Sequence, residues 1–171
     1  NHLAKKFEVR EIESPIPLLK AVKNTTELDG FRLACRKDGV ALSKFYYWLE
    51  NRLSQQPITE LEAAEQLTWF RSQDKEYVSD SFGCISAYGP NAALPHYSAT
   101  PEQQSEIHPK GLYLVDSGAQ YMHGTTDITR TMPLGELTEL EKEDYTLVLK
   151  GMIDLSMLYF PKGSKGCNID I

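Results

Sequence analysis

Residues 112–131 read LYLVDSGAQYMHGTTDITRT, and this stretch determines how the rest of the chain is interpreted. It opens with an apolar run, LYLV, which is typical of a strand buried on both faces. The later segment TTDIT is rich in β-branched residues and is typical of a returning strand. The pattern predicts a β-hairpin that carries one aspartate on each strand, Asp116 and Asp127.

Two registers of this hairpin remain open from the sequence. A turn centred between residues 121 and 122 places Asp116 and Asp127 directly opposite one another, on one face. A turn centred on residues 123–124 places the two aspartates on opposite faces of the hairpin. One extra residue, most easily a bulge at Gly118, then restores a common face. In both cases two like charges meet across the ladder, which is destabilising unless a cation lies between them. A pair of divalent metal ions bound between the two carboxylates is the simplest source of that positive charge.

Composition narrows the class of protein. A chain of 171 residues with 41% hydrophobic and 25% charged residues suits one globular core. The net charge of −6 and the lack of a basic stripe argue against a nucleic-acid partner. The sequence has no apolar run long enough for a membrane span and no secretory signal at its start, so we expect no membrane partner.

The cysteines favour a reducing compartment. Cys35, Cys84 and Cys167 are odd in number, far apart and without C-x-x-C spacing. We therefore expect buried, reduced thiols and a cytosolic protein.

Three helices are predicted from capping signals. The pairs Asn24/Glu27, Thr59/Glu62 and Thr138/Glu141 have capping-box spacing and precede apolar residues at helical intervals. The first helix should run for about seven turns, and the third should stop at Pro161.

The remaining segments are predicted to be strands and loops. Residues 1–23 should form a linker or edge strand that leads in from an upstream domain, because their prolines forbid a continued helix. Residues 77–86 should form one strand that bends at Gly83. Residues 92–97 are restricted to an edge or loop by a proline, and residues 99–111 should form a polar surface loop.

One histidine has a possible chemical role. His96 follows a proline near the expected hairpin and could act as a donor or proton carrier, or it could simply be a partly exposed histidine. His108 and His123 are predicted to be solvated residues in a loop and at the hairpin tip.

Four segments taken together resemble aminopeptidase P, the Xaa-Pro aminopeptidases, which remove an N-terminal residue that precedes proline. The resemblance follows the same order over nearly the whole chain, and DSGAQY followed by GTTDITRT carries most of its specificity. The segments are SPIPLLKAVKN (residues 14–24), GPNAALPHY (89–97), VDSGAQYMHGTTDITRTM (115–132) and VLKG (148–151).

The resemblance implies an α+β fold, the first half of a pita-bread domain, with helices packed on a mostly antiparallel sheet. Residues 1–23 would be the lead-in, and residues 24–171 the N-terminal half of the catalytic domain. That family holds two divalent metals, usually Mn²⁺, through two aspartates, one histidine and two glutamates. Asp116 resembles the terminal-metal aspartate and Asp127 the bridging one.

His96 resembles the histidine that lines the family's substrate pocket and assists at the scissile bond. One departure is visible, because the family commonly has an acidic residue where this chain has His123. The family's ligand histidine and both ligand glutamates are expected beyond Ile171. The chain by itself is therefore expected to be inactive and to bind metal weakly if at all.

The resulting hypothesis is a fragment of a metal-dependent Xaa-Pro aminopeptidase that hydrolyses the bond between an N-terminal residue and proline. Its partners would be peptides with proline in second position. The whole protein is expected to be a homo-oligomer, and the fragment to self-associate through apolar surface. The alternative is a pita-bread relative retained as a binding or interaction module without catalysis.

Overall fold

The helices begin where the capping residues predict. In the computed structural model, which describes residues 12–170, α2 (Thr25–Leu53) starts with a complete capping box between Asn24 and Glu27. The side chain of Thr59 caps α3 (Glu60–Ser72), and Thr138 caps α4 (Glu139–Ser156). The predicted end of the last helix was too late, because α4 stops before Pro161.

The lead-in differs from its prediction where it is described. Residues 16–21 form a short helix, α1 (Ile16–Ala21), where the prolines were expected to exclude one. A proline in its first turn is compatible with helix, because the missing N–H has no intrahelical partner at that position. The possible edge strand at residues 7–12 lies almost wholly outside the described residues.

All strand pairs described are antiparallel, which confirms the α+β class with a mostly antiparallel sheet. The sheets have the strand orders β1-β4, β2-β6-β7 and β3-β5-β8. Their strands are β1 (Ile58–Thr59), β2 (Tyr77–Asp80), β3 (Ile85–Tyr88), β4 (Glu106–Ile107), β5 (Leu112–Ser117), β6 (Ala119–Tyr121), β7 (Gly124–Thr125) and β8 (Ile128–Pro133). The short helices η2 (Gly89–Ala93) and η3 (Gly166–Asn168) lie between or after them.

Two strand predictions were wrong in detail. The single strand expected at residues 77–86 is divided around Gly83, since β2 pairs with β6 whereas β3 pairs with β5. The predicted surface loop at residues 99–111 contains β4, which pairs with β1. Ile107 of β4 is fully buried, so its apolar side chain outweighs the polar residues around it.

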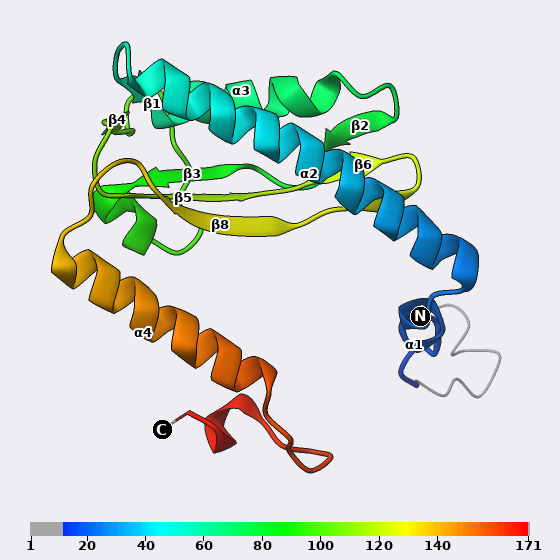
Figure 1. Ribbon diagram of the computed structural model, residues 1–171. Helices are drawn as coiled ribbons and strands as arrows, with labels where there is room; N and C mark the ends of the chain where they lie inside the picture. Colours follow the sequence, from blue (N-terminus) through cyan, green and yellow to red (C-terminus); the bar gives the residue numbers. More distant parts are fainter. Residues whose placement is uncertain (1–11, 171) are drawn as a thin grey trace, which may run out of the picture.

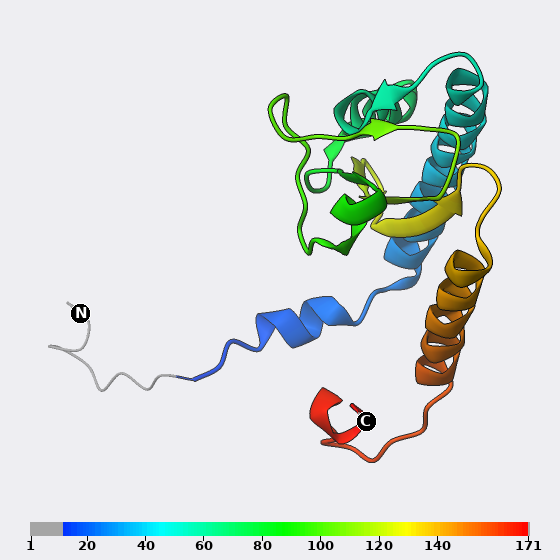
Figure 2. The same ribbon diagram turned by 90° about the vertical axis from the view of Figure 1, so that its left-hand side faces the viewer.

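Helices α2 and α3 lie on the same side of the strands, as Figure 1 shows and Figure 2 confirms from the side. Alternate residues of β5 face them, so Tyr113, Val115 and Ser117 are buried. The apolar core joins the two helices to β1, β4 and β5 through these residues: Leu42, Phe45, Leu49, Leu53, Ile58, Ala63, Leu67, Ile107, Tyr113, Val115 and Leu134.

Helices α1 and α4 project away from this core (Figure 2). Neither helix has a buried residue. Along α4, Val148, Met152 and Leu155 are each more than half exposed and recur at helical spacing, which leaves an apolar stripe uncovered. Within residues 12–170, none of the helices is both long and apolar enough to cross a membrane.

The prediction for the cysteines was only partly right. All three are free thiols, but Cys35 and Cys167 are exposed rather than buried. Cys35 follows the buried Ala34 along α2, and one residue of helix turns its side chain toward solvent. Burial raises the pKa of the Cys84 thiol to about 12.

Candidate metal site on the hairpin

The hairpin turn lies at residues 122–123, so neither predicted register is correct. Tyr121 pairs with Gly124, and Asp116 pairs with Thr129 rather than with Asp127. The turn contacts α2. Gly124 packs so closely against Phe31 that a Cβ added to Gly124 would lie 3.2 Å from the Cα of Phe31. The hairpin loop therefore has two residues, 122 and 123.

The two aspartates nevertheless share a face. Residues 118–119 and 126–127 separate the paired segments of the two strands, and their equal lengths leave no net bulge. Asp127 therefore precedes Thr129, the partner of Asp116, by two residues, which makes the carboxylates diagonal neighbours on one face of the sheet. The expected bulge at Gly118 is not needed.

The environment of the two carboxylates fits a cation. Oδ1 of Asp116 is buried and has no hydrogen-bond partner within residues 12–170. A buried oxygen without a partner is rare in native proteins and calls for an explanation such as an ion. Asp127 is exposed. Carboxylate oxygens are the ligands that hard divalent cations prefer, so these two residues could hold part of a metal site.

Residues 12–170 do not contain a complete set of metal ligands. Within residues 12–170, no group of three or more histidine, cysteine, aspartate or glutamate side chains is arranged to hold a metal ion. In this part of the chain, the carboxylates of Asp116 and Asp127 share a face of the hairpin without a third candidate donor grouped with them.

A buried ion pair lies on the other face of the hairpin. Arg71 donates from Nε to Oδ1 of Asp38 at 2.6 Å and from Nη2 to Oδ2 at 3.1 Å. The same Nη2 donates to Ser117 Oγ at 3.1 Å, and Thr126 Oγ1 donates to Asp38 Oδ2 at 2.9 Å. The helices are thereby bonded to both strands of the hairpin.

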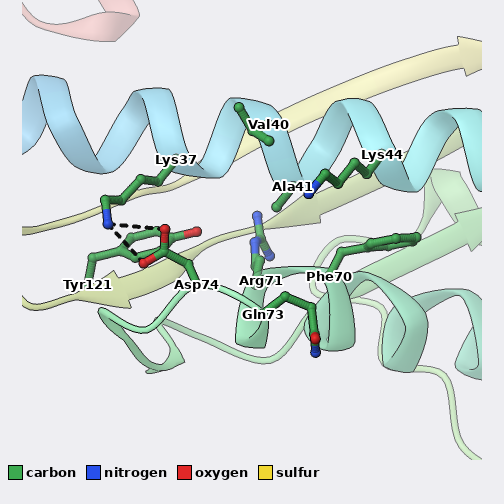
Figure 3. A pocket seen from close by; sticks show the side chains of 9 residues that line it. All are labelled: Lys37, Val40, Ala41, Lys44, Phe70, Arg71, Gln73, Asp74 and Tyr121. Carbon is green, nitrogen blue, oxygen red and sulfur yellow. Dashed lines mark hydrogen bonds and ion pairs between the residues drawn. The ribbon is translucent and has the colours of Figure 1, made fainter.

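A cavity of about 180 Å³ opens beside this ion pair, between α2 and α3. Figure 3 shows Arg71 pointing from α3 toward α2, with Lys37 and Asp74 bonded nearby. Tyr121 also lines the cavity, on the buried side of its strand. Because side chains alternate along a strand, this cavity lies on the face opposite the two aspartates and is not the metal site.

His96 lies in an exposed loop after η2, which packs on β3 and β5. Its backbone has a φ of 57°, the left-handed region that few non-glycine residues adopt. No side-chain hydrogen bond joins His96 to another residue between 12 and 170. The structure thus places His96 in the loop that follows η2, a helix that packs on the strand of Asp116. Within residues 12–170, no hydrogen bond joins His96 to Asp116 or Asp127.

The loop that carries His96 is held by a buried glutamate. Glu60 is fully buried and accepts hydrogen bonds from Tyr97 Oη at 2.7 Å, Tyr88 N at 2.6 Å and Ser105 N at 2.8 Å. Asn91 Nδ2 donates to both of its carboxylate oxygens. Burial first, and then this carboxylate, raise the pKa of Tyr97 to about 12.

His108 and His123 lie at the surface, as predicted. His108 is partly exposed, and His123 at the hairpin tip lies 3.5 Å from Glu76. Glu76 also pairs with Lys37, which bonds Asp74 at 2.8 Å. Hydrogen bonds from Lys37 lower the pKa of both acids, and the same bonds raise the pKa of Lys37.

Sequence reasoning missed the buried polar residues Asp38, Glu60 and Arg71. One signal was available for Asp38, which lies four residues after Ala34 and four before Leu42, within the apolar stripe of its helix. Glu60 and Arg71 carry a similar signal, because they lie three residues before Ala63 and four after Leu67 on the buried face of their helix. Apart from Asp38, their bonding partners had no such signal, because they lie on loops and strands distant in sequence.

The chain belongs to metallopeptidase family M24, whose family model matches residues 29–171. Its solved structural neighbours have the pita-bread fold of aminopeptidase P and prolidase, which confirms the fold expected from the resemblance.

Among similar proteins, a probable Xaa-Pro aminopeptidase P of Paracoccidioides brasiliensis (strain Pb03) is 50% identical over 95% of this chain. The chain spans about a quarter (27%) of the length of that relative. An X-prolyl aminopeptidase of Caenorhabditis elegans, described as a cytosolic enzyme with a di-nuclear active site, is 40% identical over 92% of this chain and 26% of its own, with a TM-score of 0.82. Prolidase from Pyrococcus furiosus is 26% identical over 82% of this chain and 39% of its own, with a TM-score of 0.68.

Proposed function

We propose that this chain supplies part of the active site of a metal-dependent Xaa-Pro aminopeptidase, which hydrolyses the bond between an N-terminal residue and proline. The observation that carries the proposal is the buried, unpartnered Oδ1 of Asp116, with Asp127 on the same face of the hairpin. The similarity to Xaa-Pro aminopeptidases and to an enzyme with a di-nuclear site supports it.

Asp116 and Asp127 would hold two divalent cations, and Mn²⁺ is the proposed metal. Such cations, when bound, supply the Lewis acidity that lowers the pKa of a water molecule and polarises a carbonyl group. The task of the two aspartates is to present anionic oxygens on one face of a hairpin that is anchored from its other face. A ring nitrogen of His96 would orient the peptide or carry a proton at the scissile bond.

The isolated chain of 171 residues is proposed to be inactive. Two carboxylates cannot saturate two ions, and residues 12–170 contain no group of three or more histidine, cysteine, aspartate or glutamate side chains that could hold a metal ion. We also propose a cytoplasmic location and a homo-oligomeric whole protein. Free thiols and the cytosolic C. elegans neighbour support the former.

The decisive experiment is peptide hydrolysis by the whole protein that contains this chain, with and without added Mn²⁺. The expected result is release of the N-terminal residue from Xaa-Pro peptides, lost on metal removal and in Asp127→Ala. Peptides with alanine in second position serve as the control substrate. Metal binding without any hydrolysis of Xaa-Pro peptides would favour the non-catalytic binding module instead.

A further inference from the structure

The buried ion pair between Asp38 and Arg71 needs an explanation beyond stability. Asp38 is fully buried, and the side chain of Arg71 is 1% exposed. Removing two charges from water is costly, and apolar residues of similar volume are often at least as stabilising. Instead of stabilising the fold, the ion pair could orient the groups to which it is hydrogen-bonded.

The contacts of the ion pair reach both strands of the hairpin beside the two aspartates. Arg71 bonds Ser117, which directly follows Asp116. Asp38 accepts from Thr126, which directly precedes Asp127. Both contacted side chains are buried on the helix side, and strand alternation turns the adjacent aspartates to the opposite face.

Regular strand pairing is interrupted at this place. Gly118 lies between β5 and β6, and residues 126–127 lie between β7 and β8. Side chains replace part of the ladder, because Thr126 Oγ1 accepts from Ala119 N at 3.0 Å while Ser81 Oγ donates to the Thr126 carbonyl at 2.9 Å. An added Cβ at Gly118 would collide with that carbonyl, so the two strands approach closely here.

We propose that Asp38 and Arg71 are positioning residues, which act through Ser117 and Thr126 to hold Asp116 and Asp127 in the orientation that binds metal. This inference rests on the proposed function. Neither Asp38 nor Arg71 would touch the metal. Groups that orient metal ligands through hydrogen bonds typically change metal affinity 10–100-fold when they are lost, roughly the effect expected here.

The test measures Mn²⁺ binding to the metal-free whole protein by titration calorimetry. Thr126→Val removes the hydroxyl at nearly constant volume, and Thr126→Ser restores it. Ser117→Ala cuts the contact on the other strand and serves as a second variant if Thr126→Val does not fold. Tyr113→Phe is the matched control, since it removes a buried hydroxyl, bonded to Ser86, from the strand of Asp116 without touching the ion pair.

The dissociation constant for Mn²⁺ should rise about 10-fold in Thr126→Val and Ser117→Ala, and return close to the wild-type value in Thr126→Ser. Tyr113→Phe should bind Mn²⁺ as the wild type does. Hydrogen exchange of the Ala119 amide in the metal-free protein should accelerate in Thr126→Val and not in Thr126→Ser. These readouts separate positioning from a general loss of stability.

Wild-type affinity in both Thr126→Val and Ser117→Ala, while the wild type binds and cleaves, would overturn the inference and leave the proposed function standing. Equal weakening in Tyr113→Phe would also overturn it, because the effect would then follow stability alone. A wild-type protein that binds no Mn²⁺ refutes the proposed function itself, together with this inference.

Discussion

Asp116 lies across the ladder from Thr129, and Asp127 lies two residues before Thr129, directly ahead of β8. The offset separates the two like charges along the strand while keeping both carboxylates on one face. It also leaves Oδ1 of Asp116 buried without a partner in the described residues. The hairpin therefore holds an unsatisfied acidic group that a cation would stabilise.

Asp116→Asn should stabilise the metal-free protein. Replacing the carboxylate by a neutral amide should raise the free energy of unfolding by about 1 kcal/mol, because the amide is also left without a partner but the larger cost of an unpaired, partly buried charge is removed. Urea denaturation with EDTA present measures the change. Asp127→Asn is the control, because this exposed side chain should change stability by less than about 0.5 kcal/mol. A less stable Asp116→Asn would show that the carboxylate is not strained in the absence of metal.

Asp38→Leu alone should destabilise the protein by about 3–5 kcal/mol, because it leaves the Arg71 guanidinium buried and unpaired. Combining it with Arg71→Met should recover most of that loss. A double-mutant cycle from urea denaturation gives the coupling energy. Additive losses in the double variant would mean that the two side chains do not act as a pair.

Glu60→Gln should loosen the loop that carries His96. The substitution replaces a charged acceptor of several hydrogen bonds and should cost about 1–3 kcal/mol. Hydrogen exchange across residues 89–105 should accelerate. Glu65→Gln, at an exposed position of the same helix, is the control and should leave both properties unchanged. Unaltered exchange in Glu60→Gln would contradict the anchoring role.

Stability should depend on pH through Lys37 and its two acids. The pKa values of Asp74 and Glu76 are lowered from 3.8 and 4.5 by hydrogen bonds from Lys37, so their contribution is present above those values and is lost as pH falls through the lowered pKa values. The pKa of Lys37 is raised from 10.5, so its contribution is present below 10.5 and is lost as pH rises through the raised value.

Lys37→Met should therefore be less stable than the wild type at pH 7 and should lose less stability below pH 4.5, the ordinary value for Glu76. Denaturant midpoints between pH 3 and 7 provide the measurement. Lys44→Met is the control, because Lys44 is exposed, lies two turns further along the same face of the helix and makes no ion pair within residues 12–170. Parallel pH profiles for wild type and Lys37→Met would refute this assignment.

The apolar stripe of α4 should drive self-association of the 171-residue chain. We expect the sedimentation coefficient to rise with concentration and Val148→Lys with Leu155→Lys to suppress the rise, because both side chains are more than half exposed. Thr146→Lys adds a charge at an exposed position on another side of the helix and should have little effect. A concentration-independent wild type would remove the basis for this prediction.

The helix starts were predictable because they depend on short-range bonds. Asn24 and Glu27 bond one another within one turn, whatever the rest of the chain does. The exposed Cys35 and the buried Ile107 were predicted wrongly, since their exposure depends on which helix face and which strand edge the tertiary structure covers.

The hairpin itself, its two aspartates and the resemblance to Xaa-Pro aminopeptidases followed from the sequence, because strand alternation and turn residues act between near neighbours. Only the tertiary structure decided the register, in which Tyr121 pairs with Gly124 and Gly124 packs on Phe31. It also brought Asp38 and Arg71 together beneath Ser117 and Thr126. Those contacts join residues up to 88 positions apart, and no local pattern encodes them.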